Sequence, residues 1–489
     1  MDKSPSEILD QILQEVFKSN RDPSLLLVNS QWFAHGITFV WSTARASDLL
    51  SVSKGRQQIY ASAISELEID PLEQETNPQL VTLKFPRLAS LFFHNPQRQF
   101  THRPPPPSVD LTPLHQLIPP GLRIARFEYV DDPGVLHFLQ TNCRELEELR
   151  LQNQTPKFPD EILISSFRTL LFLRRVDVLV PEFQHLPLKP SMVEALAKLP
   201  KLRELNLNRD LTRETIEHGV IPMFSFPVLE NLSLATYPSA LPGISRVFGA
   251  VQSLTLRLQG IVDPEDYPHD WPDELETGGK ALRELSKMTW LRELDITSLG
   301  WWACEPGDLL SLRNLTQLTT LSIRCGEQAP IQVRDFTDVH FRELFGSLSR
   351  LTSINLEVSG WNFTTASLAI LGQCCPLLNT CDLEGESFDF FQLHQYNAPL
   401  FPNLESLAVR ELIKEGGNRS GNGGPISASV NPQDYALQIV SHFPKLNTSG
   451  LYSTELMYWN SDDDADPVRE FQRRVVDHFK MLRNDGETL

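Results

Sequence analysis

With 489 residues and a hydrophobic content of 41%, the chain is too long for one ordinary globular core, although a repeat array has no such limit. Its formal net charge of −18 argues against a general nucleic-acid binder, which needs a basic surface to displace counterions. The N-terminus has no apolar signal region, and no stretch is long enough to span a bilayer. We therefore expect an intracellular protein, cytoplasmic or nuclear, with reduced thiols and neither a nucleic-acid nor a membrane partner.

The first forty residues form a short apolar segment with helical patterning. Ser4 can cap a helix that starts at Pro5, with Glu7 completing a capping box. Asp22 and Pro23 predict the start of a second helix, and Trp41 closes a third short element. The apolar residues of the two main helices are Ile8, Leu9, Ile12, Leu13 and Val16, then Leu25, Leu26, Val28, Trp32 and Phe33. Three helices this short carry more apolar surface than they can bury among themselves, so the segment packs on the next domain or binds a partner.

The order and spacing of these residues resemble an F-box. The matching pattern is Pro5-x-Glu7-Ile8-Leu9-x-x-Ile12-Leu13, then Leu25-Leu26-Leu27-Val28-x-x-x-Trp32, then Trp41; Asn29 departs from it, since many members have Cys there. The resemblance implies docking on the Skp-type adaptor of a cullin–RING ubiquitin ligase. The positions that would contact the adaptor are Pro5, Ile8, Leu9, Ile12, Leu13, Val28 and Trp32. The alternative is a helical cap for the domain that follows, because open-ended repeat arrays need capping.

Most of the remaining chain repeats one spacing, typified by LRELNL from Leu202. Clear copies start at Leu146, Leu173, Leu202, Leu229, Val251, Leu291, Leu318, Leu351, Leu378 and Leu404, and looser ones at Leu88, Leu122 and Leu446. Many start about 22 to 29 residues apart, the period of leucine-rich repeats. Each copy alternates apolar and other residues as a half-buried strand does. Helical spacing precedes several copies, most clearly at 191–201, 340–350 and 365–376.

The repeats predict an α/β fold: a right-handed leucine-rich-repeat solenoid of parallel strands with helical crossovers, preceded by the three-helix F-box-like segment. The residue after each strand varies, so we expect irregular turns. This pattern resembles the divergent, fungal-type repeats found behind F-boxes. The predicted organisation is an F-box-like segment at 1–45, irregular early repeats with a Pro-rich loop at 46–120, the solenoid at 121–455 with insertions near 260–280 and 411–432, and an acidic loop with a C-terminal capping helix at 456–489.

Motifs for catalysis or metal binding are missing from the sequence. The six cysteines form no paired CxxC framework, and Cys381 occupies an apolar repeat position, which predicts a buried free thiol. The glycine-rich stretch within 411–432 lacks the GK[ST] ending of a phosphate loop. We expect no cofactor and no enzyme activity. The enzyme alternative, a parallel β-helix hydrolase or lyase, is disfavoured by the helical crossovers.

Recognition residues are expected between and just beyond the buried apolars of the repeats. Trp301 and Trp302 follow one strand, Trp361 and Phe363 follow another, and Arg324 lies on the strand between them. Because aromatic and arginine side chains dominate binding energy at protein interfaces, we predict that these five residues bind a substrate protein. The alternative is that the tryptophans pack into the convex side of the solenoid or under the acidic loop.

The predicted function is the substrate-recognition subunit of an SCF-type (Skp–cullin–F-box) ubiquitin ligase. The N-terminal helices would dock on the adaptor, and through it on the cullin, while the repeats hold a protein target. The alternative is a scaffold outside any ligase, whose N-terminal helices only cap the solenoid.

Overall fold

The computed structural model describes residues 5–19, 27–70, 79–93, 115–128, 132–152, 159–179, 187–217, 222–223, 225–259, 277–299, 302–325, 331–333, 335–359, 363–411, 431–447, 451–453 and 467–486. The chain divides into two compact units. The first comprises Met1–Arg209 and His218–Ile221, and the second comprises Asp210–Glu217 and Pro222–Leu489. The boundary between the two units falls within the repeats, and the repeat spacing of the sequence gives no sign of it.

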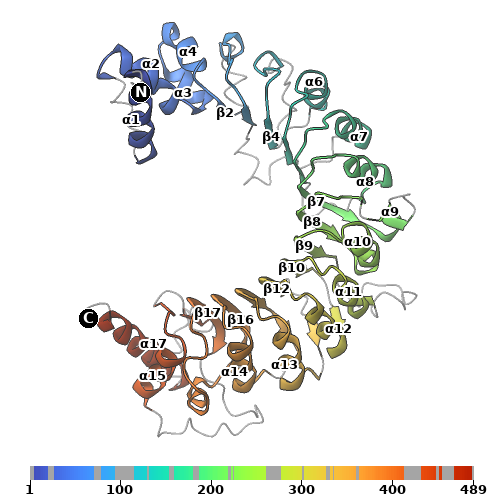
Figure 1. Ribbon diagram of the computed structural model, residues 1–489, viewed down its shortest axis with the longest axis vertical. Coiled ribbons are helices and arrows are strands. Elements are labelled where there is room, and N and C mark those ends of the chain that lie inside the picture. Colours follow the sequence, from blue (N-terminus) through green and yellow to red (C-terminus); the bar gives the residue numbers. More distant parts are fainter. Residues whose placement is uncertain are drawn as a thin grey trace. The chain divides into compact units, whose positions relative to one another are not determined.

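The first unit begins with helices and continues as a row of strands. Its elements are α1 (Pro5–Ser19), α2 (Ser30–Val40), β1 (Thr43–Arg45), α3 (Ala46–Ser51), α4 (Lys54–Ala61), β2 (Glu66–Ile69), the 3₁₀ helix η2 (Leu80–Thr82), β3 (Ser90–Phe93), β4 (Ile124–Glu128), α6 (Gly134–Asn142), β5 (Glu148–Gln152), α7 (Asp160–Thr169), β6 (Arg175–Leu179), α8 (Pro190–Ala197) and β7 (Glu204–Leu211). From β1 to β7 each strand pairs in parallel with the next. Helices α6, α7 and α8 lie on one side of this row (Figure 1). The opposite side of a strand row is called its strand face below.

The second unit repeats the same architecture. Its elements are α9 (Arg213–Glu217), β8 (Asn231–Thr236), η5 (Pro238–Ala240), α10 (Leu241–Val247), β9 (Ser253–Leu258), α11 (Thr277–Leu285), β10 (Glu293–Ser298), β11 (Trp302–Cys304), α12 (Pro306–Leu310), η6 (Ser311–Asn314), β12 (Thr320–Cys325), β13 (Ile331–Val333), α13 (Asp338–Gly346), β14 (Ser353–Leu356), β15 (Val358–Ser359), α14 (Thr365–Cys374), β16 (Thr380–Ser387), η7 (Phe390–Gln395), β17 (Ser406–Glu411), α15 (Pro432–His442), β18 (Leu451–Ser453) and α17 (Pro467–Gly486). The main parallel row runs β8-β9-β10-β12-β14-β16-β17-β18, and β11, β13 and β15 form a separate small sheet.

These elements confirm the predicted solenoid of parallel strands with helical crossovers. In the first unit the leucines of the repeat spacing pair across strands, for example Leu149 with Val176 and Val176 with Leu205, and they are buried. The predicted helices at 191–201, 340–350 and 365–376 correspond to α8, α13 and α14. Within each unit the repeats contribute their apolar residues to the same layer, so consecutive repeats of a unit share a core.

Main-chain hydrogen bonds keep the strand starts in register. The carbonyl oxygen of Glu147 accepts hydrogen bonds from the backbone N–H groups of both Arg174 and Arg175, at 2.7 and 3.1 Å. The Arg292 carbonyl does the same in the second unit for Thr319 and Thr320, at 2.7 and 3.1 Å. The fork itself is made by backbone groups, so it places no demand on side-chain identity, although the Thr319 hydroxyl adds a hydrogen bond to the Arg292 carbonyl at 3.0 Å. The strand entries are therefore regular although the sequence of the turns diverges.

The C-terminal end of the second unit is covered by α17. Its residues Val475 and Phe479 are buried, and Phe471 packs edge-on against Tyr435 of α15 at 5.9 Å between ring centroids. Arg483 donates a hydrogen bond to the Pro444 carbonyl at 2.8 Å. The helix therefore packs on α15.

The prediction of three N-terminal helices was wrong in its third element. Trp41 is the C-cap of α2, and β1 begins two residues later and pairs with β2. The strand row thus starts inside the segment assigned to 1–45. The predicted helix start at Asp22 and Pro23, the Pro-rich loop at 98–113, and most of the insertions near 260–280 and 411–432 lie outside the described residues.

Candidate protein-binding surfaces

Helix α1 carries two apolar stripes, of which one is covered. Leu9 and Leu13 are 8% and 0% exposed and form a cluster against the apolar residues of α2 and its C-cap, which are Trp32, Phe33, Phe39, Val40 and Trp41. Ile8 and Ile12 lie one turn apart on the neighbouring stripe and are 46% and 45% exposed. Leu27 and Val28, just before α2, are 81% and 58% exposed. The pair of helices therefore has its own small core and leaves four large apolar side chains facing outward.

The seven residues predicted to contact an adaptor separate into two groups. Ile8, Ile12 and Val28 are exposed, and Pro5 is the first residue of α1. Leu9 and Leu13 are buried, and Trp32 is partly buried against them, so the prediction that all seven contact a partner is corrected: these leucines hold α1 on α2. Leu27, which is 81% exposed, was not among the predicted contact residues.

Asn29, the departure from the F-box pattern, has a structural role. Its side-chain oxygen accepts hydrogen bonds from the backbone N–H groups of Gln31 and Trp32, both at 2.9 Å. It is thus the N-cap of α2, a position that favours Asn. The substitution therefore caps the helix that carries Trp32 and supplies no apolar anchor.

The helix pair is attached to the first repeat through aromatic rings. Trp41 lies 4.5 Å from the ring of Tyr60 on α4, and Phe33 meets the same ring edge-on at 6.1 Å. His35 on α2 lies 2.8 Å from the carboxylate of Asp10, which further joins α1 to α2. The N-terminal helices and the first strands therefore belong to one packed body.

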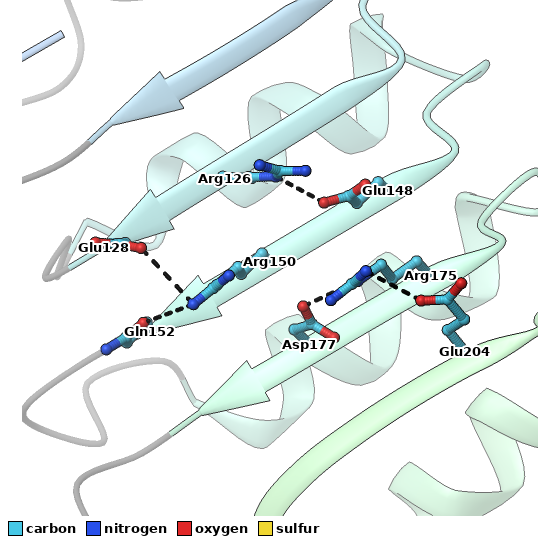
Figure 2. Close-up of polar contacts among 8 residues, drawn as sticks. All are labelled: Arg126, Glu128, Glu148, Arg150, Gln152, Arg175, Asp177 and Glu204. Atoms are coloured by element: carbon cyan, nitrogen blue, oxygen red, sulfur yellow. Dashed lines mark hydrogen bonds and ion pairs between the residues drawn. The ribbon is translucent and has the colours of Figure 1, made fainter. Parts of the chain in front are cut away.

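The strand face of the first unit carries a network of arginines and carboxylates (Figure 2). Arg126 on β4 pairs with Glu148 on β5 at 2.7 Å. Arg150 on β5 lies 3.8 Å from the Glu128 carboxylate and donates a hydrogen bond to the Gln152 side chain at 3.2 Å; Figure 2 marks both contacts. On β6, Arg175 contacts Asp177 at 3.1 Å and Glu204 of β7 at 3.0 Å. Each of the three arginines therefore contacts at least one carboxylate of this face.

Within this network two carboxylates, Glu128 and Asp177, lie deeper than the arginines that they contact. The side chains of Glu128 and Asp177 are 9% and 3% exposed, whereas that of Arg175 is 41% exposed. Burial raises the pKa of the Asp177 carboxyl, more than pairing with Arg175 lowers it. Burial opposes the charge of Arg175, but its carboxylate neighbours Asp177 and Glu204 raise its pKa. Sequence reasoning missed this network, although the repeat spacing already places Arg126, Arg150 and Arg175 between buried apolars.

Short polar side chains line the strand face of the second unit. One register row joins Ser253, Glu293, Thr320, Ser353, Thr380 and Ser406. The next row includes Asp295, Ser322, Asn355 and Asp382. The corresponding rows of the first unit hold the large residues of the arginine network. The two units therefore present chemically different faces built on the same backbone pattern.

The predicted aromatic edge of the second unit is only partly visible. Arg324 lies on the strand face and pairs with Asp295 at 2.8 Å. Trp302 belongs to β11 of the small sheet, while Trp301 and Trp361 lie outside the described residues. Phe363 is 2% exposed and meets the rings of Phe341 and Phe388 edge-on at 5.1 and 6.2 Å, so it is a core residue and its assignment to a binding groove was wrong.

The cysteines are free thiols and are mostly buried. Cys381 is 2% exposed, which confirms the prediction of a buried thiol, and burial raises its pKa. Burial likewise raises the pKa of Cys143, Cys304 and Cys375 to about 12, so these groups stay protonated and are poor nucleophiles. The described residues contain no cluster of three or more His, Cys, Asp or Glu placed to hold a metal ion. Among the same residues, no helix has the length and apolar character needed to cross a bilayer.

Comparison with known proteins gives structural likeness alone. No protein-family model matches the sequence, and no curated protein matches it. Among solved structures, similar chains include an internalin from Listeria monocytogenes (16% identity, 75% of this chain and 88% of that chain, TM-score 0.39) and a leucine-rich-repeat protein of Leptospira interrogans (14%, 82% and 86%, 0.41). A third is the leucine-rich-repeat ectodomain of a receptor kinase from Arabidopsis thaliana, solved with Casparian strip integrity factor 2 (12%, 79% and 46%, 0.33).

The class of the protein follows from its own repeats. Short parallel strands stack in register, crossover helices lie on one side, and apolar residues recur at fixed positions about every 22 to 29 residues. The chain therefore has the leucine-rich-repeat solenoid fold, in which stacked strands supply a long exposed face.

Proposed function

We propose that this chain is the substrate-recognition subunit of an SCF-type ubiquitin ligase, in which α1 and α2 dock on a Skp-type adaptor and the repeats hold a protein target. In this role the protein is an intracellular receptor, cytoplasmic or nuclear, and not an enzyme. It joins the target to the cullin-bound machinery, and its contribution is proximity. The F-box-like order of Pro5 to Trp41 and the leucine-rich-repeat fold behind it support the proposal.

One observation carries the adaptor half of this proposal. Ile8 and Ile12 on α1, with Leu27 and Val28 before α2, remain exposed although the two helices have a core of their own. Large apolar side chains that gather on the surface of a soluble protein mark an interaction site. Three of these four positions, Ile8, Ile12 and Val28, are among those that the F-box resemblance assigns to the adaptor.

A second candidate function is a scaffold whose N-terminal helices only cap the repeats. It is favoured by the packing of Trp41 and Phe33 on Tyr60, which fastens α2 to the first repeat. An open strand row needs such a cover at its first strand. The two candidates differ in whether Ile8 and Val28 contact a partner, because a helical cap does not require exposed apolar residues.

Affinity capture from native extract separates the two candidates. The full-length chain is compared with the double variant Ile8→Asp/Val28→Asp, and the captured proteins are scored for adaptor and cullin. Val339 on α13 is 73% exposed, so Val339→Asp places one such charge on an exposed apolar position outside the N-terminal helices and serves as the control. The ligase proposal predicts capture by wild type and by Val339→Asp, with loss in the double variant. Folded wild type that captures no adaptor leaves the scaffold function as the better account.

A further inference from the structure

We draw no further inference here: the strongest candidate, the network of arginines and carboxylates on the strand face of the first unit, carries nothing beyond the proposed function, because its charged side chains pair with one another and nothing in the described part of the structure shows what covers it.

Discussion

Replacing Phe363 by alanine removes a ring from the centre of the second unit. Phe363 is 2% exposed and its ring contacts those of Phe341 and Phe388, at centroid distances of 5.1 and 6.2 Å. Truncation of a buried phenylalanine costs about 3–5 kcal/mol, of which each lost aromatic pair accounts for roughly 0.5–1.5 kcal/mol. We therefore expect a loss of about 4 kcal/mol, a large part of the stability of an ordinary domain.

Urea unfolding of the full chain measures this effect. With a denaturant slope of about 3 kcal/mol/M, the transition of the second unit should move down by about 1 M in Phe363→Ala, and by less in Phe363→Leu, which keeps more of the volume. Trp290, 69% exposed, is the control: Trp290→Ala should change the unfolding free energy by no more than about 0.5 kcal/mol. If Phe363→Ala left the unfolding midpoint unchanged but abolished partner binding, the assignment of Phe363 to the core would be refuted and its predicted role in binding would be supported.

Three further predictions concern particular contacts. Burial opposes the charge of Asp160, but Arg209 at 2.6 Å and Lys189 outweigh this effect and hold the Asp160 pKa below its usual 3.8. The ion pair with Arg209 therefore stabilises the first unit above pH 3.8. This stabilisation is lost as the pH falls through the lower pKa of the folded state. Asp160→Asn should cost about 3 kcal/mol near neutral pH and flatten the acid side of a thermal-melt pH profile; an unchanged profile contradicts the assignment. Gly372→Ala should destabilise α14 in hydrogen exchange, because a Cβ there would lie 2.9 Å from the Leu400 carbonyl oxygen, and unaltered exchange would show that the backbone yields freely. Asn29→Ala should lower the free energy of unfolding by about 1 kcal/mol through loss of the α2 cap, whereas Asn29→Asp should not. Equal losses of stability in the two variants would contradict the capping role.

The repeat fold could be predicted because it depends on spacing that is local in the sequence. Leucines such as Leu149 and Leu205 recur at fixed positions, and a single repeat needs its neighbouring repeats to bury them. The pattern alone therefore indicates stacked parallel strands. The regular strand entries could not be predicted in the same way. They depend on backbone forks such as that of the Glu147 carbonyl, which leave no trace in residue identity.

The candidate surfaces were harder to predict because exposure depends on which stripe of a helix or side of a strand is covered. Ile8 and Leu9 have the same apolar character, yet one is 46% and the other 8% exposed, since α2 covers only one stripe of α1. Phe363 follows a strand as a surface aromatic would, but neighbouring phenylalanines from other repeats enclose it. Arg175 was overlooked because its role comes from pairing across strands with Glu204, which only the register reveals.

The most direct test of the ligase account is the affinity of the purified full-length chain for a purified Skp-type adaptor, measured by isothermal titration calorimetry. The account predicts a one-to-one complex with a negative heat-capacity change, as burial of the apolar side chains of Ile8, Ile12 and Val28 requires. Ile8→Asp/Val28→Asp should abolish the heat signal, while Val339→Asp should leave it unchanged. Absence of binding by folded wild type, or equal binding by the double variant, would contradict the account.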